Sequence, residues 1–224
     1  MSYLKKIACA CGVAALFATG SVAAAPIVLD FEGIGDFAAV NGFYNGGTDS
    51  SGASGTNYGI HFSLDSIGLV DSDAGGSGTI SGMPSGTTVL AFFSGGGAVM
   101  NVSAGFDTRL AFHYAAGEAG FVNVYDGLNG TGNLLAMFNL PVNVDPCQDG
   151  NNLFCVFSPV EILFAGTARS VIFGGLDGWI GFDDVAIGAL DAGPAPVPEP
   201  ASLALGALGL AGLAASRRKA GKPR

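Results

Sequence analysis

Basic residues are almost absent from the middle of this chain. Between Pro26 and Pro200 lie all 18 acidic residues of the sequence but only two basic ones, Arg109 and Arg169, and no lysine. The net charge of this stretch is therefore −16. Nucleic acids and anionic lipid head groups repel such a surface. We expect no nucleic-acid partner.

Cysteine, histidine and tryptophan are also scarce, with four, two and one residues in the whole chain. Only Cys147 and Cys155 lie in the central stretch, and no histidine is near them in the sequence, so we expect no structural zinc site. The Gly-x-Ser-x-Gly motif of an α/β-hydrolase nucleophile is missing as well. We therefore expect a protein that is not an enzyme. A secreted hydrolase that works with two facing carboxylates remains as an alternative.

Long helical periods are missing before residue 197, whereas short β-rich runs and glycines are plentiful. Turn residues such as Gly, Asn, Asp and Ser separate these runs, as in all-β sandwiches. We predict a single jelly-roll-like β-sandwich over residues 26–195. The predicted strands are Ile27–Phe31, Tyr58–Leu64, Ile67–Asp71, Thr87–Phe93, Ala98–Ser103, Thr108–Tyr114, Phe121–Tyr125, Leu134–Leu140, Cys155–Phe157, Val160–Phe164, Arg169–Phe173 and Trp179–Ile187.

The first 24 residues have the layout of a secretory signal peptide. Lys5 and Lys6 precede an apolar run from residue 7 to residue 18, and small residues follow. Such a signal implies the Sec export machinery as a partner and an oxidising compartment as the destination. Cys147 and Cys155 remain after removal of the signal, and we expect them to form a disulfide across a short loop.

The last 28 residues form a distinct C-terminal segment. Val197-Pro198-Glu199-Pro200 precedes an uncharged apolar run, residues 201–215, and a basic tail, residues 216–224. As a helix the apolar run is about 22 Å long, short for a bilayer core of ~30 Å. Positive charges tend to stay cytoplasmic, which predicts a cytoplasmic stop at Arg217, Arg218 and Lys219. The segment is either a disposable handle or a weak permanent anchor.

This order of motif, short helix and basic tail resembles the PEP-CTERM sorting signal of exopolysaccharide-producing Gram-negative bacteria, a segment also labelled as an ice-binding protein C-terminal domain. The resemblance implies recognition by an exosortase, a membrane-embedded cysteine protease–transpeptidase that cuts near Pro198-Glu199-Pro200. We therefore predict an inner-membrane intermediate and then a cell-surface or extracellular-matrix protein with a structural or adhesive role. Exopolysaccharide is the candidate partner outside the cell.

The two ends of the central domain resemble those of carbohydrate-binding and lectin-like jelly rolls. The residues concerned are Leu29–Gly33 and Gly181–Gly188. The resemblance implies that the first and last strands are neighbours. It also implies a structural calcium ion, the one cofactor that we consider, with the candidate ligands Asp30, Glu32, Asp183 and Asp184. The alternative is that Asp183 and Asp184 lie at the end of a strand and face water.

A carbohydrate-binding module is the alternative function for the central domain. Trp179, the one tryptophan of the chain, could stack on the face of a sugar ring. Tyr44, Tyr58 and Tyr114 are candidates to stand beside it. The competing interpretation of Trp179 is a partly buried residue at the edge of the core.

Overall fold

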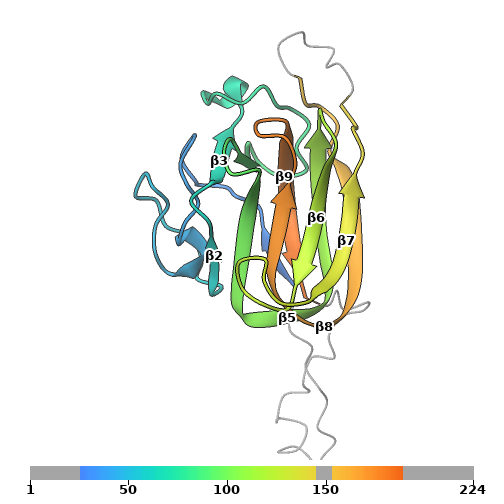
Figure 1. Cartoon of the computed structure of the whole chain (residues 1–224). Coiled ribbons are helices and arrows are strands. Elements are labelled where there is room, and N and C mark those ends of the chain that lie inside the picture. Colours follow the sequence, from blue (N-terminus) through green and yellow to red (C-terminus); the bar gives the residue numbers. More distant parts are fainter. Residues whose placement is uncertain (1–25, 145–152, 189–224) are drawn as a thin grey trace, which may run out of the picture. The chain divides into compact units, whose positions relative to one another are not determined.

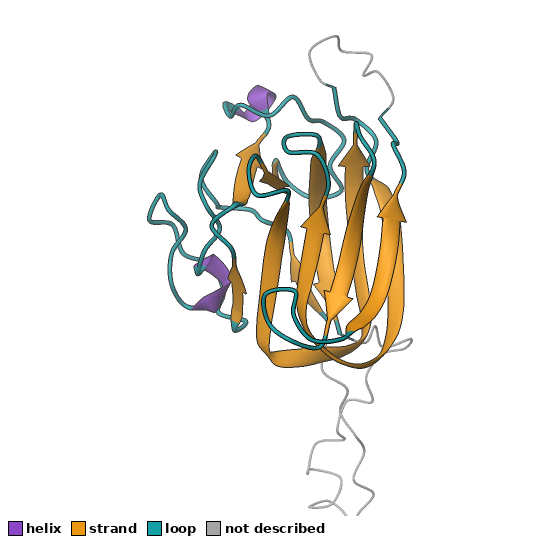
Figure 2. Ribbon diagram, viewed as in Figure 1, coloured by secondary structure: helices purple, strands orange, loops and turns teal. Residues whose placement is uncertain are grey.

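Antiparallel strands make up nearly all the regular structure of the described part of the chain (Figures 1 and 2). The computed structural model describes residues 26–144 and 153–188. These residues form nine strands and two 3-10 turns, which confirms the all-β prediction. In chain order they are β1 (Ile27–Leu29), η1 (Phe43–Asn45), β2 (Ile60–Phe62), β3 (Ser66–Val70), η2 (Ser72–Ala74), β4 (Thr88–Phe92), β5 (Gly97–Ala116), β6 (Gly120–Tyr125), β7 (Leu134–Leu140), β8 (Ser158–Gly174) and β9 (Ile180–Ile187).

The hydrogen-bonded strand order is β3-β4-β9-β5-β8-β6-β7, with β1 added to β9 and β2 added to β5. Every pair of strands is antiparallel. Ile27 of β1 lies opposite Ile187 of β9, and Leu29 lies opposite Val185. The first and last strands are therefore neighbours, as expected from the resemblance to jelly rolls.

Two long strands, β5 and β8, carry the sheet from one layer of the fold to the other. The start of β5, residues 97–101, pairs with the end of β8, and residues 109–114 pair with the start of β8. Two register shifts separate these halves. Along β5, strand β9 pairs with the second half alone, and along β8, strand β6 pairs with the end alone.

The sheet therefore folds over on itself. One layer, the first layer, contains β4, β9, the second half of β5 and the first half of β8. The second layer contains β2, the first half of β5, the second half of β8, β6 and β7.

Aromatic side chains from both layers meet in the main core. Phe173 of the second layer contacts Phe112 and Phe182 of the first layer, with ring centroids 6.0 and 4.9 Å apart. All three side chains are buried. Burial of each such ring stabilises the fold by about 1.5–3 kcal/mol. These contacts confirm the predicted β-sandwich.

The structure differs from the predicted strands in two respects. The runs 98–103 and 108–114 are parts of the single strand β5, and the runs 160–164 and 169–173 are parts of β8. Turn-forming glycines lie where these strands bend, because Gly105 and Gly166 have φ angles of 80° and 93°. The predicted strand Cys155–Phe157 is wrong, because these residues belong to no strand and β8 begins only at Ser158.

Several predictions fall outside the described residues. They concern the signal peptide (residues 1–24), Cys147, the motif Val197–Pro200, the apolar run 201–215 and the basic stop Arg217–Lys219. Among residues 26–144 and 153–188, no helix has the length and apolar character that crossing a membrane requires.

Candidate functional site

Carboxylates from both ends of the domain hold one loop, residues 85–88, which precedes and begins β4. The Glu32 carboxylate accepts hydrogen bonds from the amides of Thr87 and Thr88 at 2.8 and 2.7 Å. Asp183 accepts from the Ser85 amide at 3.0 Å and from the Ser85 hydroxyl at 3.0 Å. Two of the residues singled out from the sequence thus converge on this loop, which we call the clamped loop.

A glycine allows the clamped loop to approach Glu32 this closely. Gly86 has a φ of +42°, and a Cβ atom placed there would lie 2.1 Å from the carboxyl carbon of Glu32. No larger residue fits without moving the carboxylate. The local sequence Ser-Gly-Thr-Thr therefore matches its position between Glu32 and Asp183.

Asp183 lies in an unusual environment for a carboxylate, because its side chain is fully buried. Burial raises the pKa of this carboxyl to about 6, although hydrogen bonds from Ser85 and from the Asp184 amide act in the opposite direction. The other two carboxylates are placed differently. Asp30 is exposed and accepts from the amide of Glu32, whereas Asp184 lies at a φ of +49°.

These four carboxylates do not gather into one group of metal ligands in the described structure. Calcium takes six to eight oxygen ligands. No group of three or more His, Cys, Asp or Glu residues within residues 26–144 and 153–188 could hold a metal ion. The oxygens of Asp183 and one oxygen of Glu32 already accept hydrogen bonds from the clamped loop. Glu32 and Asp183, two of the four expected calcium ligands, therefore act as a clamp on this loop, and the calcium site stays a prediction.

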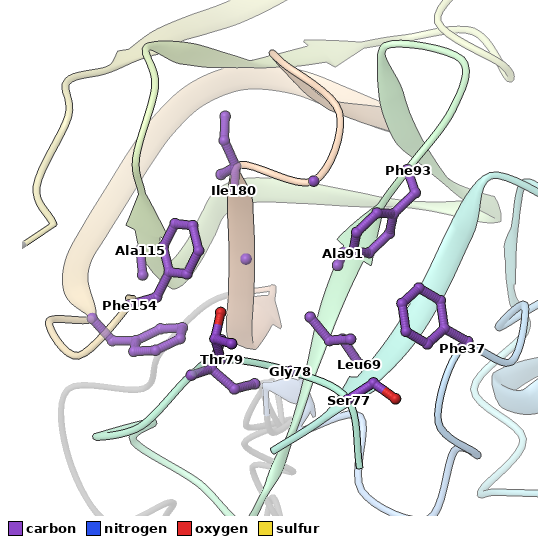
Figure 3. A pocket seen from close by; sticks show the side chains of 14 residues that line it. Phe37, Leu69, Ser77, Gly78, Thr79, Ala91, Phe93, Ala115, Phe154 and Ile180 are labelled. Carbon is purple, nitrogen blue, oxygen red and sulfur yellow. The ribbon is translucent and has the colours of Figure 1, made fainter. Parts of the chain in front are cut away.

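An apolar pocket of about 140 Å³ lies on the outer face of the first layer (Figure 3). Small side chains create its floor. Ala115 of β5 lies opposite Gly181 of β9, and Ala91 of β4 lies on the other side of Gly181, since Leu90 pairs with Phe182. Larger side chains stand around this floor. They are Phe37, Leu69, Ile80, Phe93, Phe154, Phe157 and Ile180.

Two phenylalanines form one rim of the pocket. Phe37 and Phe93 are 50% and 44% exposed, and their ring centroids lie 5.0 Å apart. Ser77 and Thr79 are the residues with polar side chains in this lining. Ser77 already donates its hydroxyl to Asp36. A ligand with an apolar ring face and a polar edge matches this lining.

Trp179 lies beside this pocket, because its neighbours in the sequence, Gly178 and Ile180, both line it. Its side chain is 43% exposed, and its ring meets Phe154 edge to face with centroids 6.4 Å apart. Gly117 makes room for it, because a Cβ atom there would lie 2.6 Å from the indole ring. Trp179 is thus a half-exposed aromatic residue on the outer face, available for stacking.

The tyrosines expected beside Trp179 lie elsewhere. Tyr44 and Tyr114 are buried, and Tyr58 stacks on Tyr44 with ring centroids 6.2 Å apart. Phe37, Phe93 and Phe154 take their place, and the sequence interpretation missed them. One signal could have shown them. In the run 88–92 every residue after Thr88 is apolar, with no alternation of polar and apolar residues. Such a run is typical of a strand that is covered on both faces.

Only one end of the predicted disulfide lies among the described residues. Cys155 follows Phe154 in the described part of the chain, whereas Cys147 lies outside it. The pairing of these two cysteines stays a prediction.

Comparison with solved structures finds chains with carbohydrate-binding and adhesin descriptions. A family 29 carbohydrate-binding module, CBM29_1 from Piromyces equi, is 12% identical, with 58% of this chain and 80% of that chain covered and a TM-score of 0.34. The K3 cleaved adhesin domain of Lys-gingipain from Porphyromonas gingivalis w83 is 16% identical, with coverages of 75% and 94% and a TM-score of 0.31. At these values the likeness says nothing about what this chain binds.

A third solved structure, the GH26-CBM35 β-(1,4)-mannanase of Podospora anserina, is 18% identical, with 61% of this chain and 29% of that chain covered and a TM-score of 0.31. No curated protein matches the chain. The family models match at the C-terminus, where residues 196–219 fit the PEP-CTERM protein-sorting motif. The chain therefore carries a PEP-CTERM sorting motif, which implies an exported protein that is held in the membrane until an exosortase processes it.

Proposed function

We propose that this chain is a surface or extracellular-matrix protein of an exopolysaccharide-producing Gram-negative bacterium, with a non-enzymatic structural or adhesive role. The match of residues 196–219 to the PEP-CTERM motif carries this proposal. The signal-peptide layout of residues 1–24 supports export by the Sec machinery. An exosortase then cuts near Pro198-Glu199-Pro200 and releases or transfers the acidic domain to the cell surface or extracellular matrix.

The mass of the exported protein tests this proposal. In normal host cells the mature product should lack residues 201–224. Replacing Pro198, Glu199 and Pro200 by alanine should leave the uncut chain in the inner membrane. Pro194→Ala is the matched control, because this proline lies just before the matched segment, and its product should be processed normally. Full-length protein in the inner membrane or cytosol of unmodified cells would refute the proposal.

Carbohydrate binding is the second candidate function, and the apolar pocket on the first layer, called the aromatic pocket from here on, favours it. Aromatic side chains that are half exposed beside a hollow are suited to stacking on the apolar face of a sugar ring. Trp179, Phe93 and Phe37 are such residues. Exopolysaccharide would then be the partner that the domain tethers, and no calcium ion is part of this proposal.

A glycan array probed with the exported protein tests this second function. Trp179→Ala and Phe93→Ala should each weaken the binding of a glycan by about tenfold, because losing one stacked aromatic ring costs roughly 1 kcal/mol or more. Met137→Ala is the control, since Met137 is also exposed but lies on β7 in the second layer. Glycans recovered after incubation should be intact. Their cleavage would instead support the secreted hydrolase.

A further inference from the structure

A groove of about 390 Å³ lies on the outer face of the first layer, apart from the aromatic pocket and without a role in the clamp. Its floor again results from small side chains. Ala111 of β5 lies opposite Ala186 of β9 on one side and opposite Glu161 of β8 on the other. Larger residues line the sides of this hollow. They are Val28, Arg109, His113, Pro159, Val160, Glu161 and Asp184.

Arg109 is the central polar residue of this groove. Its side chain is only 13% exposed, and its Nε atom donates to a carboxylate oxygen of Glu161 at 2.6 Å. Its Nη1 atom is buried and has no hydrogen-bond partner among the described residues. One of the two cations of the acidic stretch is thus held in place by a carboxylate and still has a donor unused.

His113, two residues beyond Ala111 on the same face of β5, repeats this situation. Its Nδ1 atom is also buried without a partner among residues 26–144 and 153–188. Buried polar atoms in folded proteins are nearly always paired, with protein, water or ligand. Two unpaired nitrogens on one groove therefore point to a partner from outside the described residues.

Asp184 completes the polar lining with a strained backbone. Its φ of +49° is in the left-handed region, and the pairing of β5 with β9 shifts register between Ala111 and His113, opposite this residue. Aspartate tolerates this conformation better than most residues, yet a bulge that turns a side chain is common next to binding sites. The bulge brings a second carboxylate to the groove beside that of Glu161.

The groove therefore combines unused donors with carboxylate acceptors. A free anion would pair with Arg109 but would also meet Glu161, Asp184 and the strong negative charge of the domain. A sugar hydroxyl group can accept from Arg109 and donate to a carboxylate at the same time. We propose that this groove binds a neutral saccharide chain through its hydroxyl groups. This inference rests on the proposed carbohydrate-binding function and adds a second, polar site to it.

Calorimetry on the exported protein tests the groove. The probes are neutral hexasaccharides of glucose, of galactose and of mannose, with oligogalacturonate as the acidic probe. Ala111→Leu fills the floor beside the Arg109–Glu161 pair. It should weaken the best neutral probe by about tenfold or more, since it separates the ligand from buried hydrogen-bonding groups. Ala165→Leu is the matched control, because Ala165 is an exposed residue of β8 outside the groove.

A second variant guards against a folding defect in the first. Glu161→Gln keeps the shape of the side chain but removes the charge that orients Arg109, and it should also lower the affinity for the neutral probe. Unchanged binding by both variants, or tighter binding of oligogalacturonate than of every neutral probe, would overturn the inference. If Trp179→Ala abolishes binding and the groove variants do not, the groove is wrong while the carbohydrate function stands. If no saccharide binds, both are wrong.

Discussion

Asp183 is fully buried in the first layer, where its carboxylate accepts hydrogen bonds from Ser85 and from the amide of Asp184. Burial outweighs these hydrogen bonds, so the pKa of the carboxyl rises from 3.8 to about 6. The folded state therefore keeps this proton up to a higher pH than the unfolded chain does. At the scale of single residues, the contribution of this clamp carboxyl group to stability therefore depends on pH.

The stability of the folded domain should respond to pH through Asp183. Because the folded chain binds the proton more tightly, the contribution of Asp183 to stability falls as the pH rises from 3.8 to about 6. Asp183→Asn should remove this fall, which melting temperatures across that range would measure. Asp49→Asn is the control. Burial acts to raise the pKa of Asp49, but its hydrogen bonds outweigh burial and lower the pKa. The contribution of Asp49 to stability is therefore lost only when the pH falls below the ordinary pKa of an aspartate. A fall that persists in Asp183→Asn would disprove the assignment.

Calcium provides a second prediction for the same residues. Asp183 and Glu32 bind the amides and hydroxyl of the clamped loop, and three or more metal-binding side chains do not gather anywhere in residues 26–144 and 153–188. We expect the melting temperature of the exported protein to be the same in calcium as in chelator. A clear rise with calcium would restore the calcium hypothesis that the resemblance to jelly rolls suggested.

At the scale of elements, the bends of β5 and β8 decide how the layers form. Gly105 lies at the bend of β5 with a φ of 80°, and a Cβ atom there would lie 2.4 Å from Thr167 of β8. The turn residues near Gly105 and Gly166 produced the sequence pattern of four short strands. The pattern was right about strand content but wrong about continuity, because a bent strand and a turn use the same residues.

Gly105→Ala should lower the free energy of unfolding of the sandwich by more than the cost of placing an alanine at a positive φ. An alanine at positive φ costs about 1–2 kcal/mol, and the contact with Thr167 adds to this. Gly59→Ala separates the two effects, because Gly59 has a φ of 71° and a Cβ atom added to it would meet no atom within 4 Å. Denaturant unfolding should show a larger loss for Gly105→Ala. Equal losses would mean that the bend adapts without strain.

The same scale explains why the two hollows were not foreseen. Each has a floor of small residues that face outward on neighbouring strands, such as Ala91, Gly181 and Ala115 in the pocket. Strand register across β4, β9 and β5 brings them side by side, and no local sequence signal shows that register. Trp179 was identified from its rarity, but its aromatic neighbours come from strands and loops far apart in the chain.

At the scale of the whole molecule, folding and routing belong to different parts of the chain. All described residues lie in one compact unit with its own core, whereas the sorting motif covers residues 196–219. Ending the chain after residue 192 should therefore leave the melting temperature of the domain within about 2 °C of the full chain, a shift expected for less than 1 kcal/mol. Surface retention should be lost. A large drop in melting temperature would show that the tail supports the fold.

The sequence by itself determined the all-β class, the sorting motif and the acidic character from which we expect no nucleic-acid partner, because composition and short linear motifs carry these properties without any folding. The resemblance to jelly rolls also suggested that Glu32 and Asp183 lie near each other, and the pairing of β1 with β9 is the structural finding that supports it. Only the tertiary structure decided that these carboxylates clamp a loop, that two long strands bend between layers, and that alanines and glycines open two hollows on one face. Those features depend on register between distant segments, and register is set by the packing of the complete sandwich.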